Sequence, residues 1–370
     1  NLVRKAFAKG DATREELLKA EISAYHGEGT CTFFGTANSN QMLMEIMGLH
    51  IPGSAFVHPH SDLRNAYNVV ATEQAISISR KGKDIRPIGK IIDERSFVNA
   101  IVGLHATGGS TNHTLHLPAM AAAAGIKLLW EDFSDLSEIT PLLARVYPNG
   151  NADVNQFHAA GGMSFVIGEL LDAGLLDGTA RTVWGDNLFD YISEPTLKNS
   201  QLVWNKSKSK SFDSNILKST KDPHQKNGGL KMLKGNIGRG VIKISAVNMD
   251  QQKIKAPAMV FDNQIDVKEA YDKGLLNRDV VIVVRFQGPK ANGMPELHAL
   301  TPILSNIQDL GFKVALLTDG RMSGASGKVP AAIHITPEAM DNGVIGKIKD
   351  GDEIEIDAVS GYINLNENYE

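Results

Sequence analysis

The sequence has 370 residues, of which 42% are hydrophobic and 22% are charged, and its formal net charge is -4. That length exceeds one ordinary core and predicts two domains, and the balance of apolar and charged residues is typical of a soluble globular protein. The slightly acidic charge argues against a nucleic-acid partner, which needs a broad basic surface. No apolar run reaches the length of a membrane span, so no membrane association is expected.

Cysteine occurs once, at Cys31, and this count excludes a disulfide within the chain. A lone thiol fits a reducing compartment, so a cytoplasmic location is expected. A single cysteine is also a common small buried hydrophobic residue, and that interpretation stays open at this point. The chain starts at Asn1, without an initiator Met and inside a segment of helical character, and we therefore expect further sequence upstream.

The N-terminal half has the periodicity of helices that alternate with short β-branched runs. Residues 13–25 predict a helix that begins with Thr13 as its cap and with Glu16 at the capping-box position. Residues 68–79 and 115–124 predict two further helices. The alternation predicts α/β layers over this half of the chain.

The only cysteine is expected in a loop between two helices. A Gly-punctuated turn at residues 27–30 precedes Cys31, and residues 38–47 predict the next helix, which Gly48 ends. The N-terminus of a helix stabilises a thiolate, which is the form of cysteine that binds metal.

The composition changes near residue 200, where Lys and Ser dominate and apolar periodicity is lost. We therefore expect an α/β layered domain over residues 1–200, a linker over 201–228 and a β-rich domain over 229–370. Gly and Asp or Asn turns separate the strand-like runs of the last domain, and a helix fits residues 302–310. This spacing predicts a barrel-like sheet with flanking helices, and an α/β fold class overall. The runs cover residues 241–244, 258–261, 280–286, 314–318, 333–335 and 354–356.

Four loops combine small, polar and reactive residues. Residues 29–40 surround Cys31 with Gly, Thr, Asn and Ser, which suits a thiolate that binds a bulky inorganic group. Residues 107–113 predict a strand-to-helix turn whose amides and hydroxyls can hold an oxyanion. Residues 287–296 and 319–328 each follow a predicted strand, and Gly-rich loops at strand ends commonly carry ligand chemistry.

Each loop also has a plainer interpretation. Residues 107–113 could form a tight turn with a helix cap, and Glu296 could serve a helix dipole. Residues 319–328 resemble a phosphate loop but lack its spacing, because Met322 and Val329 stand where Gly and Ser or Thr are required. By spacing alone, none of the loops establishes an enzyme.

Taken together, the four loops closely resemble the family of dihydroxy-acid, sugar-acid and phosphogluconate dehydratases. The most specific matches cover residues 30–47, 103–124 and 287–337. Within the family, residues 56–65 and 106–113 look like the phosphogluconate branch. The resemblance implies a hydro-lyase of the Entner–Doudoroff pathway of gluconate metabolism, which converts 6-phosphogluconate to 2-keto-3-deoxy-6-phosphogluconate and water.

The resemblance also implies roles for matching residues. Cys31 looks like the last cysteine ligand of an iron–sulfur cluster, 4Fe-4S in preference to 2Fe-2S, and Glu296 looks like a ligand of a Mg ion beside it. Ser323 looks like the base that removes the α-proton of the substrate. In this family the other cluster cysteines and Mg ligands lie upstream of residue 1, and a tail follows residue 370. This chain alone is therefore not expected to hold a cluster or to be fully active, and a homodimer is implied for the whole protein.

Contacts to the phosphorylated sugar acid are expected from the same loops and from one helix start. Phosphate prefers Arg forks and clustered amides, and Arg64 is the first candidate because it follows a segment that looks branch-specific. If Ser323 is not the base, His105, His113 or His298 could be, by residue type. The candidate substrate contacts are Arg64, Ser110, Thr111, Asn112, Arg321 and Lys328, with Lys290 as a further candidate for the phosphate.

Two alternatives stay open. The first is a dihydroxy-acid or unphosphorylated sugar-acid dehydratase with the same chemistry, and the second is a non-catalytic ligand-binding protein on the same fold. The presence of Cys31, Glu296 and Ser323 together argues against the second. We expect the loops of these three residues to converge on one cavity between the domains, where ligand sites often lie.

Overall fold

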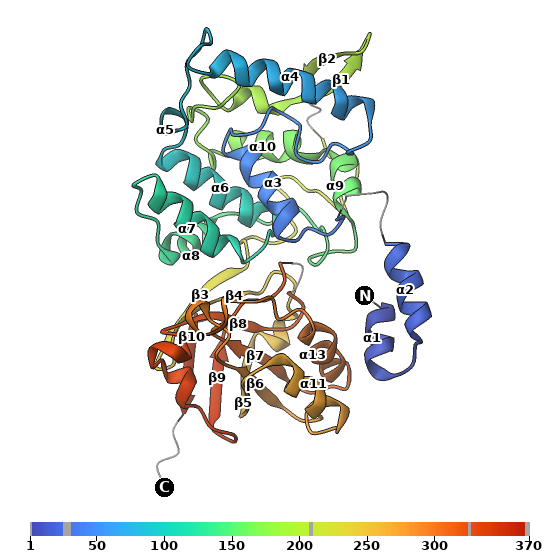
Figure 1. Cartoon of the computed structure of the whole chain (residues 1–370), viewed down its shortest axis with the longest axis vertical. Helices are drawn as coiled ribbons and strands as arrows, with labels where there is room; N and C mark the ends of the chain where they lie inside the picture. Colours follow the sequence, from blue (N-terminus) through green and yellow to red (C-terminus); the bar gives the residue numbers. More distant parts are fainter. Residues whose placement is uncertain (1, 25–30, 207–209, 325–326, 367–370) are drawn as a thin grey trace. The chain divides into compact units, whose positions relative to one another are not determined.

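The computed structural model describes residues 2–24, 31–206, 210–324 and 327–366, so the predicted turn at residues 27–30 lies outside the described residues. The chain forms two units (Figure 1). We call Gly27–Gly229 the helical unit, and we call Asn1–His26 together with Leu230–Glu370 the barrel unit. The predicted class, α/β with a barrel in the C-terminal half, is confirmed.

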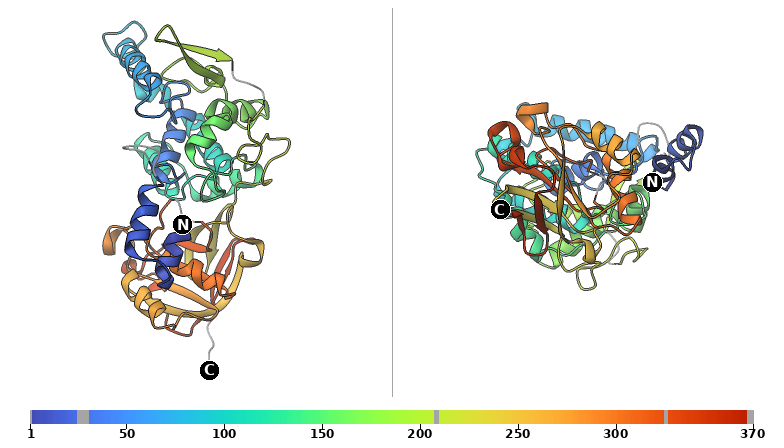
Figure 2. Two further views of the ribbon diagram at one scale, coloured as in Figure 1. Left: turned by 90° about the vertical axis from the view of Figure 1, so that its right-hand side faces the viewer. Right: turned by 90° about the horizontal axis from the view of Figure 1, so that it is seen from below.

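The first residues belong with the barrel unit, although the sequence placed them in the N-terminal domain. Helix α1 (Leu2–Lys9) packs against α13 (Leu300–Asp309) on the outside of the barrel (Figures 1 and 2). Lys5 Nζ lies 2.8 Å from a carboxylate oxygen of Asp309. Such a contact joins segments about 300 residues apart, and local sequence patterns carry no signal for it.

The segment 201–228, expected as a linker, is instead an ordered part of the helical unit where the structure describes it. Leu217 is fully buried. The backbone N–H of Lys218 donates to Leu143 O at 2.8 Å, and that of Arg145 donates to Ile216 O at 2.7 Å. Backbone pairing of this kind needs no apolar periodicity, which explains why the composition suggested a linker.

Three mutually packed helices, α3, α6 and α10, form the centre of the helical unit. No helix among the described residues is long and apolar enough to cross a membrane. The helices are α3 (Thr36–Ile46), α4 (Asp62–Ile78), α5 (Ile88–Ile91), α6 (Glu94–Thr107), α7 (His113–Ala123), α8 (Trp130–Ile139), α9 (Val154–Ala160), α10 (Gly162–Asp172) and the 3-10 helix η1 (Phe189–Ile192), and the hairpin consists of β1 (Ser193–Lys198) and β2 (Gln201–Lys206).

Helices α3 and α6 approach closely because a glycine lies at their contact. A Cβ atom at Gly103 would come within 2.7 Å of the Ile46 side chain and 3.2 Å of the Met42 sulfur. Met42 and Ile46 are fully buried. The helix predicted at residues 38–47 is thus confirmed, and Gly48 follows it with a φ of +74°.

In the barrel unit, eight strands close in the order β10-β3-β4-β8-β7-β6-β5-β9. Strands β5, β6, β7 and β8 are parallel neighbours. The strands are β3 (Leu230–Gly235), β4 (Gly238–Lys243), β5 (Lys253–Phe261), β6 (Val280–Val284), β7 (Val314–Thr318), β8 (Ala331–Thr336), β9 (Glu353–Asp357) and β10 (Tyr362–Asn366). The remaining elements are α1, α2 (Arg14–Ile22), η2 (Met249–Gln251), α11 (Gln264–Asp272), α12 (Pro289–Asn292), α13, η3 (Ala339–Asp341) and η4 (Val344–Lys347).

Aliphatic side chains form the core of the barrel. Every residue of β6 and β7 is buried, as expected for parallel strands covered on both faces. The interior cluster includes Val281, Val283 and Leu317 together with Ile354 and Ile356 of β9. All six predicted strand-like runs coincide with strands, and β3 and β10 were not predicted.

Candidate active site

The carboxyl ends of β6 and β7 bring two of the predicted loops to the same edge of the barrel. The strands pair in parallel along their whole length, so residues 287–296 and 319–328 leave the sheet side by side. An isolated parallel bridge pairs Glu296 with Arg321. Ser323 follows Arg321 by two positions, and the structure therefore brings the loops of Glu296 and Ser323 together.

The side chain of Arg321 binds the loop that carries Glu296. Its Nη1 donates to Glu296 Oε1 at 2.8 Å, and its Nε donates to the carbonyl oxygen of Met294 at 2.8 Å. Such charge-assisted bonds from one planar guanidinium fix the direction of the carboxylate. The Glu296 side chain is 35% exposed, so it is held in place and still open to solvent. The donors of Arg321, a residue predicted as a substrate contact, thus bind the loop that carries Glu296.

A buried carboxylate that the sequence did not single out ties the same edge together. Asp319 is 1% exposed, and it accepts from the backbone N–H of Gln287 at 2.8 Å and of Ala339 at 2.9 Å. A third bond comes from the N–H of Phe286 at 3.2 Å. Glu338 accepts in the same way from the first N–H groups of α12. An Asp-Gly pair after a strand signals a turn, but its distant partners cannot be read from the sequence.

Ser323 is half-buried at this edge, and the alternative bases are divided between the units. His298 is exposed, and its Nδ1 lies 3.2 Å from the carbonyl oxygen of Glu296. His105 and His113 lie in the helical unit, where burial lowers the pKa of His105 to about 4 and that of His113 to about 3. Both are neutral at pH 7, but both are nearly inaccessible to solvent.

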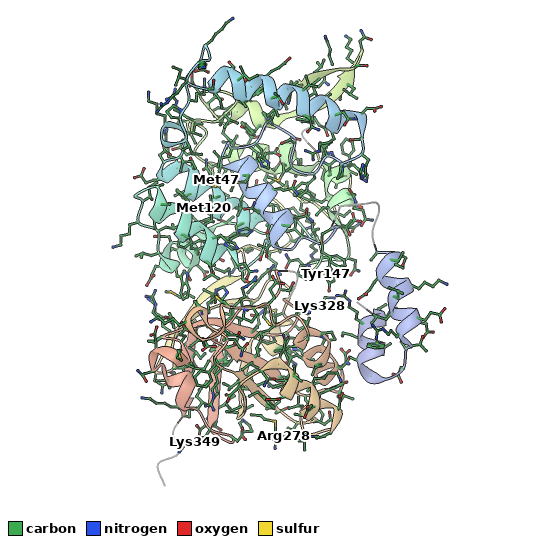
Figure 3. All side chains as sticks on the ribbon, viewed as in Figure 1. Met47, Met120, Tyr147, Arg278, Lys328 and Lys349 are labelled. Atoms are coloured by element: carbon green, nitrogen blue, oxygen red, sulfur yellow. The ribbon has the colours of Figure 1, made fainter. Side chains whose placement is uncertain are left out.

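Two lysines complete the predicted contacts of the barrel unit. Lys328 is exposed, and Figure 3 shows it at the end of the barrel unit opposite to Arg278 and Lys349. Because Arg278 lies two residues before the first residue of β6, Lys328 lies at the end where β6 and β7 finish. Lys290 forms an ion pair with Asp341.

In the helical unit, Cys31 is exposed and lies in a loop before α3. Asn38, in the first turn of α3, donates from Nδ2 to the carbonyl oxygens of Cys31 at 2.6 Å and of Phe33 at 2.7 Å. This side chain fixes the loop backbone and leaves the thiol accessible. Cys31 is therefore not a buried structural cysteine.

The turn at residues 107–113 joins two helices, and the prediction of a strand before it is wrong. Asp93 starts α6 with a capping box, and Gly108 ends it with a φ of +62°. The apolar run 101–104 is the buried face of this helix. Short apolar runs do not distinguish a buried strand from a buried helix, which explains the error.

The side chains of this turn bind the first turn of α3. Ser110 Oγ lies 2.9 Å from Thr36 Oγ1, a residue 74 positions away, and Asn112 Nδ2 donates to the same oxygen at 2.9 Å. His113 Nε2 lies 2.8 Å from Ser39 Oγ. The structure thus joins the Cys31 loop to the predicted oxyanion turn. Ser110, Thr111 and Asn112 are buried. A substrate could contact them, as predicted, only by entering this hydrogen-bonded network.

Arg64 lies toward the other end of α3. Its Nη2 donates to the carbonyl oxygens of Ser54 at 3.1 Å and of Val57 at 2.6 Å. The N–H groups on either side of Ser54 both donate at 2.8 Å to Glu45, in the last turn of α3. An 11-residue helix is about 16 Å long. Cys31 is bound at its first turn, so Arg64 belongs to a separate part of the helical unit.

Comparison with known proteins shows which family the chain belongs to. The family model described as dihydroxy-acid/6-phosphogluconate dehydratase N-terminal matches residues 2–191, and the corresponding C-terminal model matches residues 215–370. The chain belongs to the dihydroxy-acid/6-phosphogluconate dehydratase family. The predicted resemblance is confirmed.

Phosphogluconate dehydratases and a dihydroxy-acid dehydratase resemble the chain to different degrees. It is 57% identical over 364 residues to the phosphogluconate dehydratase of Rhizobium meliloti (strain 1021). The aligned residues cover 98% of this chain and 60% of the relative. It is 54% identical to the phosphogluconate dehydratase of Escherichia coli (strain K12), with 98% and 60% covered. Identity to the dihydroxy-acid dehydratase of Caldanaerobacter subterraneus subsp. tengcongensis is 35%, with 97% and 62% covered. The chain thus spans about 60% of the length of the phosphogluconate dehydratases that it matches.

Cys31 and Glu296 are too few ligands to make up the iron–sulfur and Mg sites that this dehydratase family implies. Iron–sulfur clusters are held by several cysteine thiolates, and Cys31 is the one cysteine. Glu296 offers one carboxylate. In the described part of the chain, no three His, Cys, Asp or Glu side chains gather as a metal site. The residues fit single ligands of such groups, not complete sites.

Proposed function

We propose that this chain provides part of a phosphogluconate dehydratase, which removes water from 6-phosphogluconate and yields 2-keto-3-deoxy-6-phosphogluconate. The observation that carries the proposal is the difference in identity between relatives. Two that are named phosphogluconate dehydratase are 57% and 53% identical to the chain, and one named dihydroxy-acid dehydratase is 35% identical. The phosphogluconate branch is therefore favoured over the dihydroxy-acid branch.

The chemistry requires a base and a source of positive charge. The reaction breaks the C2–H bond and the C3–O bond, and the enol that forms tautomerises to the 2-keto acid. The C2 proton is weakly acidic and hydroxide leaves poorly, and a bound metal ion supplies positive charge that eases both problems. We propose Ser323 as the group that accepts the C2 proton. The Ser323 hydroxyl must first give up its own proton to solvent, and nearby positive charge and the amides of its Gly-rich loop would stabilise the alkoxide that then accepts the C2 proton.

We propose Glu296 as a Mg ligand and Arg321 as the residue that orients it. The support is the pair of bonds from Arg321 to Glu296 Oε1 and to Met294 O. These bonds hold the carboxylate in one direction before a metal arrives, as partners of metal ligands commonly do. Two of the Arg321 donors are used within the loop, and this weakens Arg321 as a candidate for the phosphate. Lys328 stays a candidate at the same end of the barrel.

In the helical unit, we propose that Cys31 is one thiolate ligand of a 4Fe-4S cluster whose other ligands are outside this chain. Its exposed thiol and its position before α3 support this role. Convergence of the Cys31 loop with those of Glu296 and Ser323 stays a prediction, as do the contacts of Ser110, Thr111 and Asn112 to substrate. We also propose that the protein is a homodimer. We propose a cytoplasmic location because a single thiol fits a reducing compartment.

The test is an activity assay of the full-length protein, prepared without oxygen, on three substrates. We expect kcat/KM for 6-phosphogluconate to exceed the values for gluconate and for 2,3-dihydroxyisovalerate. Preference for 2,3-dihydroxyisovalerate would place the protein in the other branch. If an iron-loaded preparation turns over none of the three, the non-catalytic alternative is favoured.

A further inference from the structure

A cavity of about 300 Å³ lies beside one face of α4 in the helical unit. Residues at helical spacing along α4 line it, from Arg64 through Asn68 and Ala71 to Ala75 and Ile78. The opposite wall comes from the end of α3 and from residues 49–54. Its volume is at the lower end of the range for small-molecule sites.

The cavity contains a positive charge without a matching carboxylate. Arg64 is half-buried and has no ion pair among the described residues. None of the residues that line the cavity is Asp or Glu. The carboxyl group that acts on Arg64 electrostatically is Glu45, whose two oxygens accept backbone N–H groups. Burial raises the pKa of Glu45 to about 7, so below neutral pH it contributes little negative charge.

The guanidinium of Arg64 is already oriented. Two carbonyl oxygens, of Ser54 and Val57, hold its Nη2, which leaves the remaining N–H groups for a ligand. Gln41, Asn68 and Gln74 also line the cavity, and Gln74 Nε2 donates to the carbonyl oxygen of Val183 at 2.5 Å. A fixed guanidinium in a cavity lined by no Asp or Glu favours a phosphate or carboxylate over an uncharged molecule.

Part of the wall is apolar, beside the polar residues His50, Ser54 and Tyr67, and can contact the carbon body of a ligand. Ala71, Ala75 and Ile78 on α4 face this cavity together with Leu49 and Ile51. A ligand that fills the space would place its charged group on Arg64 and its carbon body against these side chains.

We propose that this cavity binds a small phosphate monoester, with the phosphate on Arg64 and the body against the Ala71–Ala75 wall. The site lies at the end of α3 away from Cys31. Two sources of the ligand share this chemistry. One is the substrate of the proposed reaction, in which case the inference rests on the proposed function, and the other is a separate phosphorylated metabolite.

Calorimetric titration of the 370-residue chain tests the proposal without any need for turnover. The probes are 6-phosphogluconate, glycerol 3-phosphate and gluconate. We expect the phosphorylated probes to bind, and Arg64→Met to weaken their binding by at least about tenfold, the effect of one lost charge-assisted contact. Arg80→Met is the matched control, because Arg80 is an exposed arginine just beyond the same helix.

A second variant protects the test against misfolding of Arg64→Met. Ala75→Leu keeps Arg64 and its two carbonyl bonds, suits a helix and fills part of the cavity. It should also weaken binding by about tenfold or more. Selective binding of 6-phosphogluconate would identify the substrate as the source, and equal binding of glycerol 3-phosphate would identify a separate site. Absence of binding by the unmodified chain, or unchanged binding in both variants, overturns the proposal, whatever the outcome of the dehydration assay.

Discussion

The barrel unit and the helical unit place their polar loop residues in contrasting ways. In the barrel unit, two parallel strands release their loops at one edge, and Arg321 holds Glu296 while that side chain stays 35% exposed. In the helical unit, the polar groups of the α6–α7 turn bind the first turn of α3 and are buried. The edge of the barrel thus leaves Glu296 partly accessible, whereas the α6–α7 turn uses its polar groups for structure. Cys31 is exposed in the helical unit.

The largest expected effects come from one substitution in each unit of the full-length protein. Ser323→Ala should lower kcat by about 100-fold or more, since it removes the proposed base, and bound iron should be unchanged.

Cys31→Ser should abolish activity and remove iron while the fold is retained, because it takes away the proposed cluster ligand. Iron content and kcat, measured on the same preparations, check both outcomes.

His298→Ala is the control for the base, since His298 is exposed and lies beside Glu296. A modest loss is expected. If Ser323→Ala keeps most of its activity and His298→Ala does not, the base is the histidine. A Cys31→Ser protein with normal iron content would rule out Cys31 as a ligand.

Removal of a buried carboxylate should destabilise the barrel unit strongly. Asp319→Ala leaves three backbone N–H groups, two of them buried, without their acceptor, and we expect a loss of about 3 kcal/mol in the free energy of unfolding. Denaturant unfolding provides the measurement. Asp309→Ala is the control, because Asp309 forms a partly exposed ion pair with Lys5, and about 1 kcal/mol or less is expected. Equal losses for the two variants would show that Asp319 does not organise this edge.

The two units should respond to pH in opposite directions. Burial raises the pKa of Glu45 from 4.5 to about 7, so its contribution to stability is full below pH 4.5 and is lost as the pH rises through about 7. Burial lowers the pKa of Lys243 in the barrel from 10.5 to about 7, so its contribution is full above pH 10.5 and is lost as the pH falls toward 7.

Glu45→Gln and Lys243→Met test this contrast. The difference in unfolding free energy between the unmodified chain and Glu45→Gln should fall between pH 5 and pH 8, and the difference from Lys243→Met should rise between pH 7 and pH 10. Unfolding in urea at each pH gives both differences. Differences that do not change with pH would mean that neither group is buried as described.

The sequence predicted the barrel better than the connections that build the site. Strand β6 is aliphatic throughout and follows Asp279, and β7 is aliphatic up to Thr318 and precedes Asp319, so their pattern is clear. In contrast, β3 (Leu230–Gly235) carries two lysines, and β10 (Tyr362–Asn366) carries two asparagines. Their strand state depends on partners far along the chain, which local patterns do not encode.

The same limit applies to the candidate site. Glu296 and Ser323 were chosen from motifs, and parallel strand ends explain why they meet. The commitment of Arg321 to Glu296 and the three bonds to Asp319 depend on side-chain directions across two loops. Residue type alone suggested a phosphate contact for Arg321, because a guanidinium binds a carboxylate and a phosphate with the same geometry.

The smallest expected effect concerns α2, whose predicted capping box is confirmed. Thr13 Oγ1 accepts from Glu16 N at 3.2 Å, and Thr13 N donates to Glu16 Oε2 at 2.7 Å. Thr13→Ala removes the first bond and should cost the helix about 1 kcal/mol. Because α2 has no buried residue, this loss should appear as faster amide exchange within α2 and leave the denaturant midpoint unchanged. Thr13→Ser retains the hydroxyl and should exchange as the unmodified chain does. A lowered midpoint in Thr13→Ala would mean instead that α2 unfolds together with the barrel, and that the cap stabilises the whole unit.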